Sequence, residues 1–310
     1  MKHSLLAAAA ALTLTAPSAA QQAPAPAAEI PSPGEIAAAA PAKDWIAIPA
    51  SDLLVMDLAP DVKGKPRRVV IQLMPAPFSQ GWIGNIRKLA AAHWWDGTSV
   101  NRVQDNYVAQ WGDATEKKAL PDGLAVVPES NYLASGRAFP IKVVLRRQNR
   151  KDAYTGAAVP LLGWPIALDK GSAWPVHCYG MVGVGRNMSP DTGSGAELYT
   201  VIGHAPRHLD RNIALVGRVI SGIEYLSSLP RGTGALGFYE TEAERVPIAS
   251  IRIATDLPSA DQPKFEYLST ESDSFAKYAD ARANRRDPFF IKPAGGADIC
   301  NIPVPVRAAK

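Results

Sequence analysis

Two short stretches of this sequence match motifs that carry chemistry. Gly232-Thr-Gly-Ala-Leu-Gly237 has the spacing of a dinucleotide-binding loop. That loop follows a strand and opens a helix, whereas Pro230 precedes this one and an aromatic and acidic stretch follows it. Asp191-Thr-Gly-Ser194 spells an aspartic-protease loop, whose mechanism needs two carboxylates that share a proton. The sequence holds no second copy, so we interpret both stretches as loops.

Histidine and cysteine residues give two further candidates. His204 and His208 have the spacing of helix-borne metal ligands, but Pro206 between them argues against a helix. His177 and Cys178 are adjacent, and neighbours on a strand point to opposite faces, so we do not expect a nucleophilic pair. A Gly-x-Ser-x-Gly nucleophile motif is missing from the sequence. We therefore predict no metal and no cofactor.

The composition is that of a globular protein, because 47% of the 310 residues are hydrophobic and 20% are charged. The net charge of +4 is spread along the chain without long single-sign runs, which argues against a nucleic-acid binder. The two cysteines are too few for a zinc ribbon or a disulfide scaffold. The oligomeric state stays open, with a monomer as our working expectation.

The first 20 residues have the layout of an export signal. A basic start precedes an apolar run over residues 5–14, and Ser18-Ala-Ala20 supplies the small residues that a signal peptidase reads. We expect cleavage after Ala20 and a periplasmic or secreted protein, because no later segment is apolar enough to span a membrane. An oxidising compartment allows Cys178 and Cys300 to form a disulfide, although two free thiols remain the alternative.

The elements that must position any site are mostly short strands. Strand patterns bounded by Pro, Gly and turn residues occur at residues 53–56, 68–73, 99–103, 107–110, 181–185, 198–202, 214–220 and 248–253. Helical spacing occurs at residues 81–92, 223–229 and 274–283. Many short strands with few helices favour a β-barrel or sandwich over repeated βαβ units.

Two blocks in this pattern resemble the cyclophilin-type peptidyl-prolyl isomerases. Residues 95–103 (WDGTSVNRV) and 107–113 (YVAQWGD) are similar to the family's first block. The second block follows in the same order as GMVGVG at 180–185, LYTV at 198–201, HLD at 208–210 and VGRV at 216–219. The resemblance covers about residues 53–254 and implies a mainly β fold, an eight-stranded antiparallel barrel capped by two helices.

The implied domain organisation has four parts. Residues 1–20 are the signal peptide and residues 21–43 an Ala/Pro-rich disordered linker. Residues 44–257 form the barrel domain, with an insertion at about 116–179. Residues 258–310 are a C-terminal extension that we expect to pack on the barrel.

The resemblance also assigns the site. It places the catalytic arginine at Arg102 and a supporting glutamine at Gln110. It assigns substrate binding to Tyr107, Val108, Gly185, Arg186, Glu197, Tyr199, His208, Leu209 and Ile213.

Three of these binding residues depart from the family pattern. Glu197 stands where Gln is usual, His208 where many members have Trp, and Ile213 where many have His or Tyr. We expect Glu197 to pair with Arg102 or Arg186 and His208 to affect sensitivity to cyclic-peptide inhibitors. Ile213 is expected to remove a polar group from the pocket rim.

The implied activity is cis-trans isomerisation of X-Pro bonds in exported, proline-containing polypeptides. Arg102 would donate a hydrogen bond to the prolyl nitrogen while the pocket desolvates the amide. One alternative is a cyclophilin-like peptide-binding or chaperone module with weak or no isomerase activity, to which the departures at Glu197 and Ile213 lend weight. A protease built on Asp191 is a third hypothesis.

Overall fold

The computed structural model describes residues 30–136 and 152–309. The expected signal peptide, the first part of the expected linker and part of the insertion lie outside the described residues. None of the helices in the described ranges is long and apolar enough to cross a membrane.

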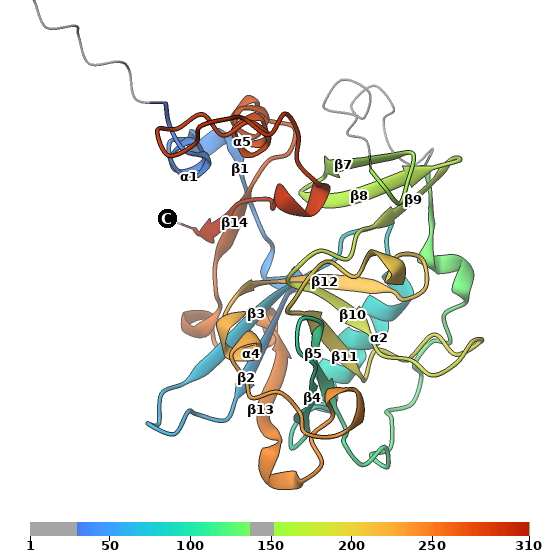
Figure 1. The fold of residues 1–310 in the computed structure, drawn as a ribbon. Coiled ribbons are helices and arrows are strands. Elements are labelled where there is room, and N and C mark those ends of the chain that lie inside the picture. Colours follow the sequence, from blue (N-terminus) through green and yellow to red (C-terminus); the bar gives the residue numbers. More distant parts are fainter. Residues whose placement is uncertain (1–29, 137–151, 310) are drawn as a thin grey trace, which may run out of the picture.

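Eight antiparallel strands close into a barrel, which confirms the predicted fold class (Figure 1). The order around the barrel is β10 (Met181–Val184), β11 (Leu198–Val201), β5 (Val108–Gly112), β4 (Ser99–Val103), β13 (Val246–Ile253), β2 (Leu53–Leu58), β3 (Arg67–Leu73) and β12 (Leu215–Ser221). The eight strands correspond to the eight predicted strand patterns, with ends that differ by a few residues.

The strands β2 and β3 have apolar sequences because both of their faces are buried. Leu54 and Ile71 belong to the core inside the barrel, whereas Val55 and Val70 pack under Phe265 from the C-terminal extension. A strand that is buried on both faces reads as a continuous hydrophobic run.

Two helices lie against the barrel. α2 (Gln80–Ala91) buries Trp82, Ile86 and Leu89 in the barrel core, as their helical spacing predicts. The short helix α4 (Glu224–Ser227) contacts β3, and the chain reaches Pro230 a few residues later.

The insertion forms a second antiparallel sheet. Its order is β6 (Ala134–Ser135), β9 (Ser172–Pro175), β8 (Trp164–Asp169) and β7 (Ala157–Leu161). These strands are hard to predict from the sequence because Pro is rare inside a sheet. Here Pro160 and Pro165 face each other across β7 and β8. The turn between these strands places Leu162 and Gly163 at φ 51° and 82°, as a two-residue hairpin requires.

The N-terminal and C-terminal segments fold together, so the expected linker over residues 21–43 is wrong for its last part. β1 (Trp45–Ala47) joins β14 (Phe265–Leu268) and β15 (Val306–Ala308) in a three-stranded sheet. α1 (Pro33–Ala38) packs on α5 (Asp273–Ala283) beside this sheet (Figure 1).

A sequence signal for α1 was present within the Ala/Pro composition. Ser32 and Glu35 form a capping box and Pro33 is the first helical residue. Ala37 is then buried in a small core with Tyr278 of α5. The small alanine side chains that suggested a linker allow the two helices to approach closely.

A disulfide joins Cys178, at the end of the insertion, to Cys300 in the extension. His177 and Cys178 lie in a loop, so the premise that they share a strand is wrong, and the bonded sulfur is in any case no nucleophile. Cys300 lies in a 3-10 turn, Ile299–Asn301. The bridge ties the C-terminal extension to the segment that enters β10.

We expect reduction of this disulfide to lower the free energy of unfolding by about 5 kcal/mol, because it closes a loop with a sequence separation of 122. Urea unfolding with and without reductant measures the loss. Thiol alkylation followed by mass spectrometry is the control. Two alkylated cysteines in protein purified from its host without reductant would contradict the pairing.

Candidate active site

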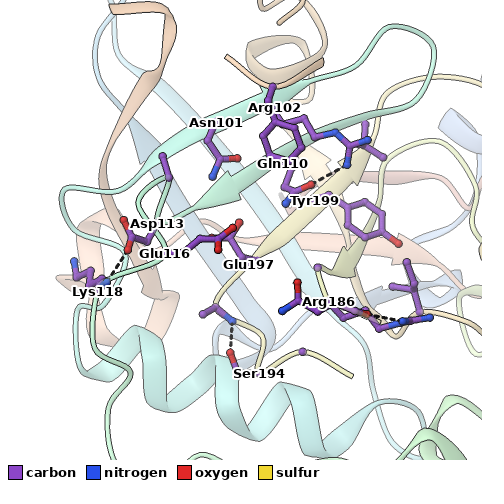
Figure 2. Close-up of a pocket in the computed structure, with 18 of the residues that line it drawn as sticks. Asn101, Arg102, Gln110, Asp113, Glu116, Lys118, Arg186, Ser194, Glu197 and Tyr199 are labelled. Carbon is purple, nitrogen blue, oxygen red and sulfur yellow. Dashed lines mark hydrogen bonds between the residues drawn. The ribbon is translucent and has the colours of Figure 1, made fainter. Parts of the chain in front are cut away.

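Arg102, Gln110 and Tyr199 form a row across three neighbouring strands. Arg102 of β4 pairs with Gln110 of β5, which pairs with Tyr199 of β11. Side chains at paired positions share one face of an antiparallel sheet, so these three project together (Figure 2). A register shift between Val100 and Arg102 breaks the regular pairing at the row's first member.

The row lies in a groove with a cavity volume of about 670 Å³. All of the predicted catalytic and binding residues line it except His208. His208 is exposed, and its ring stacks on that of Tyr107 with centroids 6.4 Å apart. His208 therefore packs against Tyr107, a residue of the groove wall, from outside the groove.

The guanidinium of Arg102 is fixed by three oxygen acceptors. Its Nε donates to the carbonyl of Leu236 at 2.8 Å, and one terminal nitrogen donates to Oε1 of Gln110 at 3.1 Å (Figure 2). The other terminal nitrogen donates to Gln104. Burial lowers the pKa of Arg102 from its ordinary value, yet an arginine remains protonated at neutral pH.

Aromatic rings complete the surroundings of this cation. The guanidinium carbon lies 5.7 Å from the ring centroid of Tyr107 and 5.2 Å from that of Phe238. Both distances allow cation–π attraction. The cation is thus held by neutral oxygens and ring faces, with no carboxylate neutralising it among the described residues.

An apolar pocket adjoins the arginine. Val108, Tyr199 and Val201 are buried there, and Tyr107, Leu209 and Ile213 pack against them. Ile213 therefore extends the apolar wall, in agreement with the expected loss of a polar group. A pocket of aliphatic and aromatic side chains can hold a pyrrolidine ring and exclude water from the neighbouring amide.

Glu197 does not pair with either arginine, which corrects the sequence expectation. Its carboxylate hydrogen-bonds with Gln110, Asn101 and the backbone of Asp113. It extends toward Gly112, where a Cβ atom would lie 1.9 Å from Oε1 of Glu197. The absence of a side chain at Gly112 therefore leaves the space that the Glu197 carboxylate occupies, away from Arg102.

Arg186 also has other partners. Its Nε donates to the carbonyl of Asn212 at 3.0 Å and a terminal nitrogen donates to the carbonyl of Asn187 at 2.7 Å. Arg186 stands at the opposite side of Tyr199 from Arg102 (Figure 2), and Gly185, its neighbour in the chain, also lines the groove. The loop beyond them is the turn predicted for Asp191, whose carboxylate accepts from the backbone nitrogens of Asn187 and Gly193.

Sequence reasoning missed the contribution of the Gly-rich loop to the site. This loop supplies the Leu236 carbonyl and the Phe238 ring to Arg102, and Phe238 forms an isolated β-bridge with it. The signal available in the sequence was the pair of apolar residues Leu236 and Phe238 within a Gly-rich loop. In the structure these two side chains are 67% and 40% exposed.

The other motifs set aside in the sequence hold no metal cluster. Within residues 30–136 and 152–309, no group of three or more His, Cys, Asp or Glu side chains is arranged to hold a metal ion. The Gly232–Gly237 stretch forms a loop with one 3-10 turn, Ala235–Gly237, as the sequence interpretation predicts.

Glu197 generates a pH prediction. Burial raises its pKa to about 7, against 4.5 ordinarily, although its hydrogen bonds act to lower it. The folded state therefore holds this proton more tightly, and the resulting stabilisation is present below about pH 4.5 and is lost as the pH rises through 7.

We expect the free energy of unfolding of the wild type to fall between pH 5 and 8 relative to Glu197→Gln, by at most about 3 kcal/mol. Urea unfolding across this pH range measures the difference. Glu116→Gln, at an exposed position on the groove rim, is the matched control. Parallel pH profiles for wild type and Glu197→Gln would contradict the expectation.

Comparisons with known proteins agree with this geometry. The family model for "Cyclophilin type peptidyl-prolyl cis-trans isomerase/CLD" matches residues 65–255, more than half of the chain. A search of curated proteins found no match.

Two solved structures are similar to the chain. The crystal structure of the cyclophilin AquaCyp293 from Hirschia baltica has a TM-score of 0.63 and 21% identity, covering 86% of this chain and 94% of that one. A cyclophilin-type isomerase from Cryptosporidium parvum, crystallised in the presence of the dipeptide Ala-Pro, has a TM-score of 0.38 and 11% identity. It covers 64% of this chain and 98% of that one. The first likeness supports the fold and the family model gives the family. The chain therefore belongs to the cyclophilin-type peptidyl-prolyl cis-trans isomerases, and the predicted enzyme class is confirmed.

Proposed function

We propose that this groove isomerises X-Pro bonds of exported polypeptides, with Arg102 donating a hydrogen bond to the prolyl nitrogen. The observation that carries the proposal is a fixed, half-buried guanidinium directly beside an apolar pocket. The proline ring would occupy the pocket formed by Val108, Tyr199 and Leu209.

The chemistry follows from the nature of the amide bond. Resonance gives the C–N bond partial double-bond character and a rotation barrier of roughly 18–20 kcal/mol. At the twisted transition state this resonance is lost and the prolyl nitrogen regains its lone pair. A donor aimed at that nitrogen therefore binds the transition state more tightly than either planar isomer, which is the condition for catalysis.

Arg102 suits this role because it is charged and pre-oriented. A guanidinium has five N–H groups, and the three described hydrogen bonds leave donors for a substrate. Gln110 holds one terminal nitrogen over the sheet, so little rotamer freedom is lost when a peptide binds. Gln110 thus positions the guanidinium of Arg102 by accepting a hydrogen bond from it.

One hydrogen bond does not account for the whole rate gain. Accelerating an exchange of ~100 s to ~1 ms needs about 7 kcal/mol, whereas a charge-assisted hydrogen bond contributes about 1.5–3 kcal/mol. Desolvation in the apolar pocket and anchoring of the peptide backbone along the groove supply the remainder. Water would otherwise stabilise the planar, charge-separated amide.

The proposed compartment is outside the reducing cytoplasm. Two features support it: the export-type sequence of residues 1–20 and the disulfide between Cys178 and Cys300. We also propose that the chain acts as a monomer without nucleic acid.

We expect Arg102→Ala to lower kcat/KM for a short X-Pro peptide roughly 10- to 100-fold, the value of one charge-assisted hydrogen bond. The fold should persist, because Arg102 is only half-buried at the edge of the core. Isomerisation is followed by NMR exchange, and circular dichroism checks the fold. Arg286→Ala, an exposed arginine paired with Asp280 in the extension, is the control.

The same experiment distinguishes an isomerase from a peptide-binding module. A wild type that binds proline peptides but isomerises them no faster than Arg102→Ala would favour a binding module. Cleavage of the peptide would instead revive the protease hypothesis.

Export has its own test. We expect the protein recovered from its host's extracytoplasmic fraction to begin at Gln21, which N-terminal mass spectrometry detects. Recovery of the chain with Met1 intact in the cytoplasmic fraction would contradict export.

A further inference from the structure

Tyr199 connects the proline pocket to a buried polar network. Its ring lines the groove, and its hydroxyl lies 3.0 Å from Nε2 of His177. His177 is completely buried, and its ring is nearly parallel to that of Tyr199. The hydroxyl of a pocket-wall residue is therefore held from inside the protein.

The hydrogen-bond roles in this pair follow from Asp210. Oδ1 of Asp210 accepts from both Nδ1 and the backbone nitrogen of His177, at 2.9 and 3.0 Å. A carboxylate only accepts, so Nδ1 carries the imidazole proton and Nε2 is left to accept from the Tyr199 hydroxyl. Burial lowers the pKa of His177 and keeps the ring neutral, consistent with this arrangement. The single hydroxyl proton of Tyr199 is thereby committed to His177.

Asp210 is itself held by Arg207, and this contact fixes a second wall of the pocket. Nε of Arg207 donates to Oδ2 of Asp210 at 2.8 Å. Arg207 begins a 3-10 turn, Arg207–Leu209, that also carries His208 and Leu209. His208 stacks on Tyr107 and Leu209 lines the pocket, so the position of this turn sets both.

The far end of the network lies outside the barrel. Both terminal nitrogens of Arg207 donate to Asp152 of the insertion, at 2.8 and 3.1 Å. The side chains of Arg207 and Asp152 are only 3% and 2% exposed. Asp298 of the C-terminal extension lies 3.9 Å from Arg207, two residues before the disulfide-bonded Cys300. Asp152 of the insertion and Asp298 of the extension therefore both connect to the walls of the proline pocket through one arginine.

We propose that Asp152, Arg207, Asp210 and His177 are positioning residues that set the shape of the proline pocket and so its affinity for X-Pro substrates. The inference rests on the proposed function and gives the insertion a role in it. None of these four residues lines the groove, so they act only through Tyr199, Leu209 and His208.

The first test is Asp152→Asn, which keeps the size of the side chain and removes one partner of the charge pair. We expect KM for an X-Pro peptide to rise roughly 10-fold while kcat changes less than about 3-fold, because Arg102 and Gln110 are untouched. Asp57→Asn is the matched control, since Asp57 accepts two hydrogen bonds from Arg68 and lies outside the groove. It should leave both constants unchanged.

A second variant isolates the hydroxyl. Tyr199→Phe keeps the ring and removes only its contact with His177, and we expect a rise in KM in the same direction. In the double variant, Asp152→Asn should raise KM by a smaller factor than it does alone, because both changes disrupt one network. If Asp152→Asn does not fold, the KM of Tyr199→Phe tests the proposal by itself: a raised KM supports it and a wild-type KM contradicts it.

Results that contradict the positioning role can be distinguished from results that contradict the proposed isomerase function. Wild-type KM values in both variants, or an equal rise in Asp57→Asn, would overturn the positioning role while leaving the isomerase intact. If the wild type does not isomerise, the proposed function fails. The same variants are then compared by their Kd for an Ala-Pro peptide, and equal Kd values would overturn the inference.

Discussion

The arrangement of the groove depends on the charge of Arg102, which no carboxylate among the described residues neutralises. A guanidinium that is half-buried beside apolar side chains loses hydration, so its N–H groups need acceptors. A carboxylate partner would satisfy them but would also hold the cation away from a substrate. Here the acceptors are a carbonyl and two amide oxygens, with the rings of Tyr107 and Phe238 alongside. The cation is thus held in place and still available to a substrate.

This arrangement explains why Glu197 sits where it does. A carboxylate in the same groove could have neutralised Arg102, yet Gly112 opens a recess that takes the side chain, and Gln110 lies between the two groups as a partner of both. Burial raises the pKa of the acid to about 7, so a large share of the molecules carry its protonated form at neutral pH. A protonated carboxyl has both a donor and an acceptor, as does the glutamine usual in the family. The departure from the family pattern is therefore smaller in chemical terms than the change of residue suggests.

The sequence predicted the barrel strands and most of the groove because both depend on local patterns. Alternation and turn residues mark the strands, and the block around Arg102 carries several site residues at fixed spacing. Prediction failed where the deciding contacts are remote in sequence. The insertion strands are obscured by Pro160 and Pro165, which lie opposite each other on the edge strand β7 and its neighbour β8. Phe238 reaches Arg102 across a bridge that no spacing encodes.

The proposed positioning role of the buried network would connect those remote segments to the chemistry. A proline pocket needs walls that stay in place when it is empty, and side chains on a barrel's outer face have only one neighbouring layer to hold them. His177 and the Arg207–Leu209 turn supply a second layer, and Asp152 of the insertion anchors it. Because Asp152 and Arg207 are both almost fully buried, separating them would leave an uncompensated charge, so the anchor resists small displacements. In the proposed arrangement the added segments support the walls of the proline pocket without contributing residues to them.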